Sequence, residues 1–157
     1  SPHERQRFVK GKSTMSVEDE CNNKPTALSF GENLLANLWD SKDSKGFVDE
    51  FDDNAVWNVN TSPPAQGKEA IQSLSKILMG MTASSRHFDL QGISTADGGH
   101  YTIWGSVEYK LVDDDNNDDV VVCAFSDIFE MRNGKIAAAW TNMDVTPMTE
   151  AAAGEKK

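Results

Sequence analysis

Basic residues, long apolar runs and cysteines are all scarce in this sequence. Its 157 residues include 15 Lys and Arg against 25 Asp and Glu, which gives a formal net charge of −10. Nucleic acids and anionic membranes bind basic surfaces, so this charge argues against both partners. No run approaches the roughly 18 apolar residues of a membrane helix, and the charged first residues lack the apolar core of a secretory signal. The two cysteines predict no disulfide, and we expect a cytoplasmic protein.

Motifs of several enzyme classes are also missing. The sequence contains no Gly-x-Ser-x-Gly elbow, no phosphate-binding Gly-rich loop and no His-Glu-x-x-His helix. No spacing of Cys and His fits a zinc site. The acidic run at 113–119 fails as an EF-hand loop, because Asp118 and Ala124 stand where Gly and Glu are required. We expect no metal and no cofactor, and we interpret the acidic run as a solvated hairpin tip.

The remaining pattern predicts a single α+β domain. Residues 1–25 and 149–157 are predicted to be tails, which leaves a domain at 26–148. Helical spacing of apolar residues at about 29–41, 47–51 and 67–81 is followed by strand patterns at 85–93, 101–111, 120–132 and 135–143, with one short strand earlier at 55–59. Helices first and most strands later is the α+β order.

Two helix predictions name particular residues. Ser29 and Glu32 have the spacing of a capping box, which predicts the start of the first helix. The helix at 67–81 carries its apolar residues on one face, which we expect to be buried. That face consists of Ile71, Leu74, Ile77, Leu78 and Met81.

Asn133 and Gly134 separate the two longest strand patterns and predict a two-residue hairpin turn, because both residue types tolerate positive φ. Strand alternation puts Asp127 on one face with Phe125 and Phe129. A carboxylate there must be paired, hydrogen-bonded or neutral. Either burial raises the pKa of Asp127 and makes it a hydrogen-bond donor, or Asp127 pairs with a cation at a dimer contact.

Asp144 and His87 each allow two interpretations. Asp144 ends the last strand, where it is either a base in a pocket or a cap of the following turn. His87 begins a strand and is either half-buried against the backbone or a proton carrier facing a pocket. On the opposite face of the sheet, Val120, Val122, Ala124, Ile128 and Trp104 form an apolar surface, which predicts a homodimer through this face.

The chain resembles the nuclear transport factor 2-like superfamily, in its polyketide-cyclase (SnoaL-like) and ketosteroid-isomerase branch. The matching segments are Asp40 to Trp57 (which ends in FDDNAVW), 66–71 (QGKEAI), 86–88 (RHF) and the hairpin from Phe125 to Asp144, and the resemblance covers about 29–147. It implies a cone-shaped, curved antiparallel sheet packed on three N-terminal helices, with an apolar pocket at the open end of the cone.

The resemblance carries over only some active residues. Asp127 falls at the protonated oxyanion-hole Asp of the ketosteroid isomerases, but Val59 and Leu35 replace their general base and Tyr, so steroid isomerisation is not expected. Asp144 and His87 match a terminal Asp and a pocket His of cyclase-like members. We expect an apolar small molecule to be bound by Trp39, Trp57, Val59, Phe125, Trp140 and Asn142.

These residues lead to one functional hypothesis and one alternative. In the hypothesis, Asp144 abstracts a proton α to a carbonyl, and His87 or protonated Asp127 stabilises the enolate. Isomerisation, cyclisation and dehydration share that step. The alternative is a non-catalytic ligand-binding or dimerisation domain. Whether Asp127 and Asp144 converge in one pocket distinguishes the two.

Overall fold

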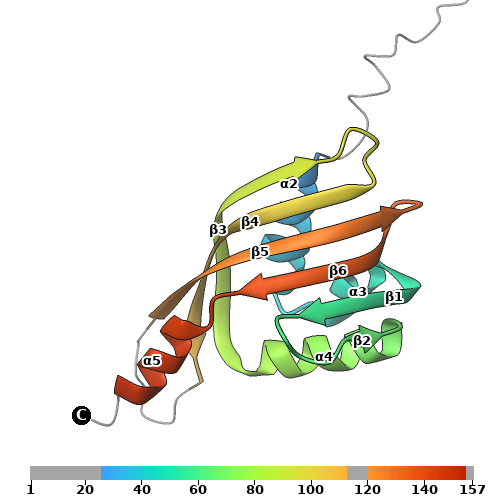
Figure 1. The fold of residues 1–157 in the computed structure, drawn as a ribbon. Helices are drawn as coiled ribbons and strands as arrows, with labels where there is room; N and C mark the ends of the chain where they lie inside the picture. Colours follow the sequence, from blue (N-terminus) through green and yellow to red (C-terminus); the bar gives the residue numbers. More distant parts are fainter. Residues whose placement is uncertain (1–25, 113–119, 155–157) are drawn as a thin grey trace, which may run out of the picture.

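A curved six-stranded sheet with helices against one face makes up the described part of the chain (Figure 1). The computed structural model describes residues 26–112 and 120–154. The predicted N-terminal tail and the acidic run at 113–119 therefore lie outside the described residues. No helix within these two ranges is long and apolar enough to cross a membrane.

The N-terminal helices are mostly short. Helix α2 (Ala27–Gly31) runs directly into the π-helix η1 (Glu32–Trp39), and α3 (Ser44–Asp49) follows. After β1 (Phe51–Val59) and the two-residue β2 (Ala65–Gln66) comes α4 (Lys68–Gly80), which has 13 residues. The α+β class is confirmed, whereas the expected set of three N-terminal helices is not: the first is divided, the second has 6 residues, and only α4 is long.

The rest of the chain builds the sheet. Strands β3 (Thr82–Ser94), β4 (His100–Leu111), β5 (Val120–Arg132) and β6 (Lys135–Met143) follow in sequence, and helix α5 (Thr146–Gly154) ends the described chain. The strand order is β2-β1-β6-β5-β4-β3. All neighbours are antiparallel except β1 and β6, which run parallel, so the expectation of a wholly antiparallel sheet is wrong at that pair.

The hairpin of β5 and β6 has the predicted bounds and turn. Asn133 and Gly134 adopt φ values of 51° and 75°, which a type I′ turn requires. The long strands then bend around the helices. Asp89 has a φ of 51° at a bulge in β3, and opposite it a Cβ on Gly105 would lie 2.9 Å from the Asp89 carbonyl oxygen. Glycine therefore permits the bend that hollows the inner face of the sheet.

Helix details differ from the sequence prediction in three places. Thr26 is the N-cap of α2, since its Oγ1 accepts the Ser29 N–H at 3.2 Å, so the proposed capping box is wrong. On α4 the buried residues are Ile71, Ser75 and Met79. Of the predicted apolar face, Ile71 is buried and Leu74 and Leu78 pack against the core. Ile77 and Met81 are 62% and 59% exposed, so the prediction is wrong for these two residues.

Ser75 can occupy the buried face of α4 because its hydroxyl is satisfied internally. Its Oγ lies 2.7 Å from the Ser44 Oγ on α3. At the other end of the chain, residues 146–154 form helix α5 rather than the predicted tail at 149–157. Met148 and Ala151 of α5 pack against the core, so this segment is part of the folded domain.

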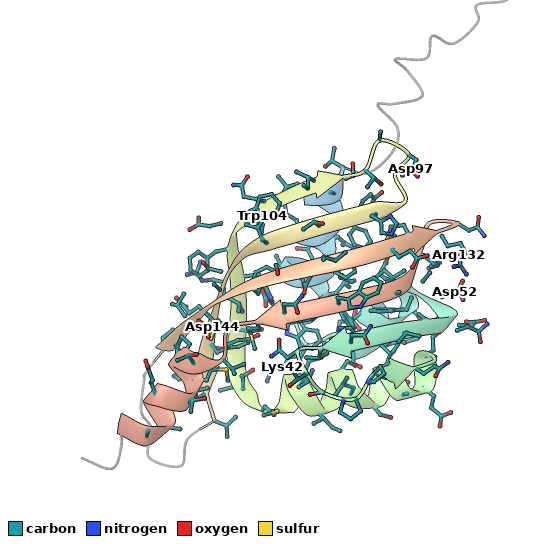
Figure 2. All side chains as sticks on the ribbon, in the orientation of Figure 1. Lys42, Asp52, Asp97, Trp104, Arg132 and Asp144 are labelled. Carbon is teal, nitrogen blue, oxygen red and sulfur yellow. The ribbon has the colours of Figure 1, made fainter. Side chains whose placement is uncertain are left out.

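The outer face of the sheet is apolar and uncovered in the single chain. Trp104, Val120, Val122, Ile128 and Trp140 are all exposed there, and Figure 2 labels Trp104 on β4. They alternate with inward-facing residues such as Ile103 and Asp127.

Candidate active site

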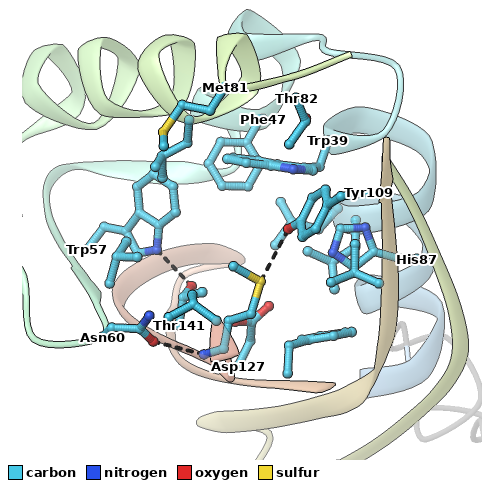
Figure 3. A pocket seen from close by; sticks show the side chains of 18 of the residues that line it. Trp39, Phe47, Trp57, Asn60, Met81, Thr82, His87, Tyr109, Asp127 and Thr141 are labelled. Atoms are coloured by element: carbon cyan, nitrogen blue, oxygen red, sulfur yellow. Dashed lines mark hydrogen bonds between the residues drawn. The ribbon is translucent and has the colours of Figure 1, made fainter. Parts of the chain in front are cut away.

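An apolar cavity of about 360 Å³ lies between the inner face of the sheet and the helices (Figure 3). This volume is near the lower end of small-molecule sites, roughly 300–1,000 Å³. Within residues 26–112 and 120–154, no Lys or Arg lines the cavity. The lining residues are Leu34, Leu35, Trp39, Phe47, Trp57, Val59, Asn60, Ser62, Leu78, Met81, Thr82, His87, Val107, Tyr109, Phe125, Asp127, Phe129, Thr141, Met143, Val145 and Met148.

One wall of the cavity is an aromatic cluster from three elements. The Trp39 ring lies edge-on to Phe47 and Trp57, with ring centroids 5.0 and 5.9 Å away. Such contacts hold large rings in fixed positions. Trp39, Trp57, Val59 and Phe125, which we expected at the substrate, all line the cavity.

Trp140 and Asn142, by contrast, lie on the outer face. In the β5–β6 ladder, Trp140 pairs with Ile128 and Asn142 pairs with Ser126, whereas Thr141 pairs with Asp127. Directly opposed residues share a face of the sheet, and alternation turns Thr141 inward and its two neighbours outward. The expectation that Trp140 and Asn142 bind substrate in this cavity is therefore wrong.

Asp127 lies at the inner face with almost no solvent contact, being 3% exposed. The Trp57 Nε1–H donates to the Thr141 Oγ1 at 2.9 Å, and the Thr141 hydroxyl in turn hydrogen-bonds the Asp127 side chain. Asp127 Oδ1 has no hydrogen-bond partner among the described residues. Because Thr141 occupies the other side of the carboxyl group, Oδ1 is the atom left for a ligand.

Burial controls the charge of Asp127. It raises the pKa from 3.8 to about 7, against the opposing effect of the Thr141 hydrogen bond. At and below neutral pH a large share of Asp127 is thus an uncharged carboxylic acid, which can donate a hydrogen bond. Of the two interpretations of Asp127, the structure supports the buried donor. Asp127 points away from the outer face where a dimer contact would supply a cation.

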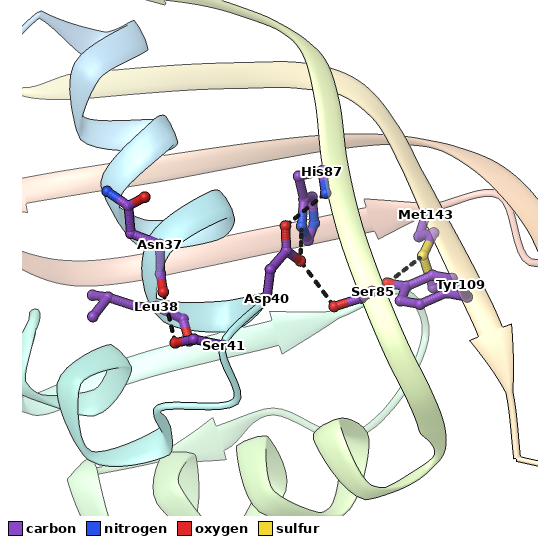
Figure 4. A network of polar contacts seen from close by, with 8 residues as sticks. All are labelled: Asn37, Leu38, Asp40, Ser41, Ser85, His87, Tyr109 and Met143. Carbon is purple, nitrogen blue, oxygen red and sulfur yellow. Dashed lines mark hydrogen bonds and ion pairs between the residues drawn. The ribbon is translucent and has the colours of Figure 1, made fainter.

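His87 lines the same cavity and is held by Asp40 (Figure 4). Asp40 follows η1, and its Oδ1 lies 2.8 Å from His87 Nδ1 while its Oδ2 accepts the His87 backbone N–H at 2.7 Å. The Ser85 hydroxyl adds a third hydrogen bond to Oδ1 at 2.8 Å. Asp40 therefore hydrogen-bonds both the backbone N–H and the imidazole ring of His87.

Asp40 is ionised in this arrangement. Burial alone would raise its pKa, but hydrogen bonds and charge from His87, with the Ser85 hydroxyl, together lower it below its ordinary value. An ionised carboxylate only accepts hydrogen bonds, so Nδ1 of His87 carries the proton of the pair. In the neutral ring Nε2 is then unprotonated and able to act as a base.

Asp144 does not reach the cavity. Its Oδ1 accepts the Thr146 backbone N–H at 3.0 Å at the start of α5 (Figure 2). The side-chain and backbone hydrogen bonds of Thr146 lower the pKa of this exposed carboxylate. Asp144 is thus a cap of the following turn, one of the two predicted alternatives. Asp127 and Asp144 therefore do not converge in one pocket, because Asp144 follows the last residue of β6 and its carboxylate is engaged by the Thr146 N–H.

Comparison with known families now adds to this geometry. The family model of the SnoaL-like domain matches residues 32–139. The chain belongs to the SnoaL-like family. The resemblance to the nuclear transport factor 2-like superfamily is thereby confirmed. No curated protein matches the chain.

Solved structures share the fold of this SnoaL-like chain. A proposed polyketide cyclase of Pseudomonas putida is 20% identical, with a TM-score of 0.67 over 80% of this chain and 96% of that one. A proposed isomerase of Bacillus subtilis is 17% identical, with a TM-score of 0.66 over 82% and 94%. A Catenulispora acidiphila protein with a ketosteroid isomerase-like fold, solved with trimethylamine, is 11% identical, with a TM-score of 0.63 over 73% and 85%. At these identities the likeness establishes the fold alone.

Three polar residues of this SnoaL-like site were missed from the sequence. Tyr109 is buried on the inner face of β4 and lines the cavity. Ile103, Val107 and Tyr109 are an even number of positions apart on one strand and so share a face. The inward position of Tyr109 could therefore have been predicted from the sequence. Thr141 was equally predictable from its pairing with Asp127. Asp40 was not, because no local pattern links the end of η1 to a strand 47 positions later.

Proposed function

We propose that this SnoaL-like protein is a cofactor-independent acid–base enzyme that acts on an apolar, carbonyl-containing small molecule. His87 removes a proton α to the carbonyl, and the protonated carboxyl group of Asp127 donates a hydrogen bond to the enolate oxygen. The observation that carries the proposal is that both groups line one apolar cavity, each with an atom left free for a ligand.

The two groups have complementary protonation states. Asp40 keeps the proton of His87 on Nδ1, so Nε2 is available as a base. Burial keeps Asp127 largely protonated below about pH 7. Enolate formation requires a base and a hydrogen-bond donor, and the neutral form of the His87 ring and the protonated carboxyl group of Asp127 can supply them. His87 replaces Asp144 as the proposed base, because Asp144 lies outside the cavity. By the criterion drawn from the sequence, the separation of Asp127 and Asp144 favours the binding module. The catalytic proposal therefore depends on His87 and Asp127, which both line the cavity.

The same enolate serves isomerisation, aldol cyclisation and dehydration. After proton removal, the enolate can be reprotonated at another carbon, attack a second carbonyl, or expel a β-hydroxyl group. Two proteins of the same fold are a proposed polyketide cyclase and a proposed isomerase, and both activities belong to this group of reactions. The second candidate function is a non-catalytic module that binds an apolar ligand, which the aromatic wall and the lack of cationic lining residues also support.

Deuterium exchange tests the choice between these functions. The wild-type protein is incubated with 2-tetralone in D₂O, and loss of the α-proton signals is followed by NMR. We expect exchange to be faster than in buffer alone. In His87→Gln, the exchange rate in excess of the buffer rate should fall about 10²-fold or more. Asp127→Asn is expected to lower it as well, and Asp144→Asn to leave it unchanged. Binding of the ketone without accelerated exchange would favour the binding module.

A further inference from the structure

The Tyr109 hydroxyl group lies at the cavity and has only a poor hydrogen-bond acceptor, the Met143 sulfur. The residue is 9% exposed and lines the cavity, and its hydroxyl donates to the Met143 Sδ at 3.4 Å (Figure 3). A thioether sulfur is a weak hydrogen-bond acceptor. A buried Tyr hydroxyl ordinarily finds an oxygen or nitrogen partner. A ligand oxygen in the cavity would therefore compete successfully with Met143 for this O–H.

The Tyr109 hydroxyl acts as a donor and not as a proton source. Burial raises its pKa far above the ordinary value of 10, and the nearby Cys123 and Asp127 add to the effect. It stays protonated at every pH at which the protein is expected to work. Ionisation chemistry is excluded for it, but hydrogen-bond donation is favoured.

Asp127 provides the second free position in the same cavity. Its Oδ1 is buried and unpartnered among the described residues. Tyr109 lies on β4 and Asp127 on the adjacent β5, and each faces the cavity. The lining also includes apolar and aromatic side chains, as at Phe125 and Val107, and none of its described residues is a Lys or Arg that could bind a carboxylate or phosphate. The cavity thus has two separate donor positions in apolar surroundings.

We propose that the cavity takes an uncharged apolar molecule with two oxygen acceptors, one bound by the Asp127 carboxyl group and the other by the Tyr109 hydroxyl, which leaves Met143 when the ligand enters. Tyr109 is then a specificity-determining residue that selects ligands by their second oxygen. This inference rests on the proposed function for the role of Asp127. It adds a hydrogen bond from the Tyr109 hydroxyl to the ligand, which replaces the bond from that hydroxyl to Met143.

The test uses calorimetric binding at pH 6, where Asp127 is mostly protonated. The probes are 2-naphthol, which has one oxygen, and 1,5-, 2,6- and 2,7-dihydroxynaphthalene, which offer a second oxygen at three different spacings. Tyr109→Phe removes the hydroxyl and keeps the ring. Met143→Leu keeps similar volume and removes the competing sulfur. Thermal unfolding of each variant checks that the fold is retained.

We expect wild type to bind at least one diol more tightly than 2-naphthol. Tyr109→Phe should weaken that diol about 5- to 10-fold, the usual effect of one hydrogen bond, and change 2-naphthol less than 2-fold. Met143→Leu should tighten the same diol, because the hydroxyl no longer has an internal acceptor. A merely structural role of Tyr109 would affect both classes of probe equally.

The outcomes separate this inference from the proposed function. If Tyr109→Phe leaves every diol unchanged, or weakens 2-naphthol and the diols alike, the second-acceptor inference is overturned. If Asp127→Ala, which removes the carboxyl donor, leaves 2-naphthol binding unchanged, the proposed role of Asp127 is overturned instead. A wild-type protein that binds none of the four probes at millimolar concentration overturns both.

Discussion

The Nδ1 atom of His87 lies 2.8 Å from the Oδ1 atom of Asp40, although 47 positions separate the two residues in the chain. This pair ties the end of η1 to the inner edge of β3 and orients the imidazole ring in the cavity wall. The same contact therefore has a structural and a chemical consequence, and the two can be measured separately.

Replacing Asp40 by Asn tests both consequences. The pKa of Asp40 is lowered in the fold, so its stabilising contribution is present above the unfolded value and is lost as pH falls through the folded value. We expect Asp40→Asn to lower the melting temperature at pH 7 and to differ little from wild type near pH 2. Ketone exchange should fall at least 10-fold, because the amide no longer holds the His87 proton on Nδ1. Asp49→Asn is the control, since its exposed pair with Lys45 contributes little. Equal losses in the two variants would contradict the special role of Asp40.

Asp127→Asn should stabilise the protein at neutral pH. With a folded pKa of about 7 and an unfolded value near 3.8, the folded state binds a proton that the unfolded state releases between these values. The free energy of unfolding of wild type therefore falls from about pH 4 to about pH 7. The full effect is on the order of 4 kcal/mol, from roughly 1.4 kcal/mol per pKa unit.

Urea unfolding at several pH values measures this difference. We expect the curve of Asp127→Asn to be flatter than that of wild type between pH 4 and 7 and to lie above it at pH 8. Strong destabilisation of the variant at pH 7 would instead show that Asp127 is an ionised partner of a cation, and the donor role would fail.

Asp144→Ala should affect helix α5 and leave the chemistry intact. The substitution removes the carboxylate that accepts the Thr146 N–H, and with it the capping of this turn. We expect faster amide hydrogen exchange in residues 146–154 and unchanged ketone exchange. A large loss of catalysis in this variant would restore the terminal carboxylate as a candidate base.

The outer face of the sheet is proposed to pair with a second copy of the chain. Trp104, Ile128 and Trp140 leave an apolar surface there that a monomer would expose to water. We expect a homodimer in sedimentation at micromolar concentration and a monomer for Ala124→Arg, which puts a charge in the centre of that face. Ile77→Arg, on the exposed side of α4, is the matched control and should remain dimeric. A wild-type monomer under these conditions would contradict the proposal.

Local patterns were sufficient for the β5–β6 hairpin, which carries Asp127. Asn133 and Gly134 adopt the positive φ values that their residue types tolerate, so the bounds of β5 and β6 could be predicted from the sequence. Period-two alternation likewise predicted that Asp127 shares a face with Phe125 and Phe129, and the structure shows that all three are buried. Alternation and turn chemistry act between neighbours in the chain, which is why one sequence suffices to read them.

The assembly of the site was decided by tertiary structure. The parallel pairing of β1 with β6, the stripe that α4 buries and the position of Asp144 at the start of α5 all depend on how distant elements pack. So does the Asp40–His87 pair, since a carboxylate at the end of a helix is usually solvated and nothing near it in sequence marks a partner. The sequence by itself determined that a carboxyl group lies on an apolar face of a strand. Only the folded chain showed that this face is buried and placed the His87 imidazole, held by Asp40, beside the same cavity. The contact between Asp40 and His87 spans 47 positions and forms when the sheet bends around the helices.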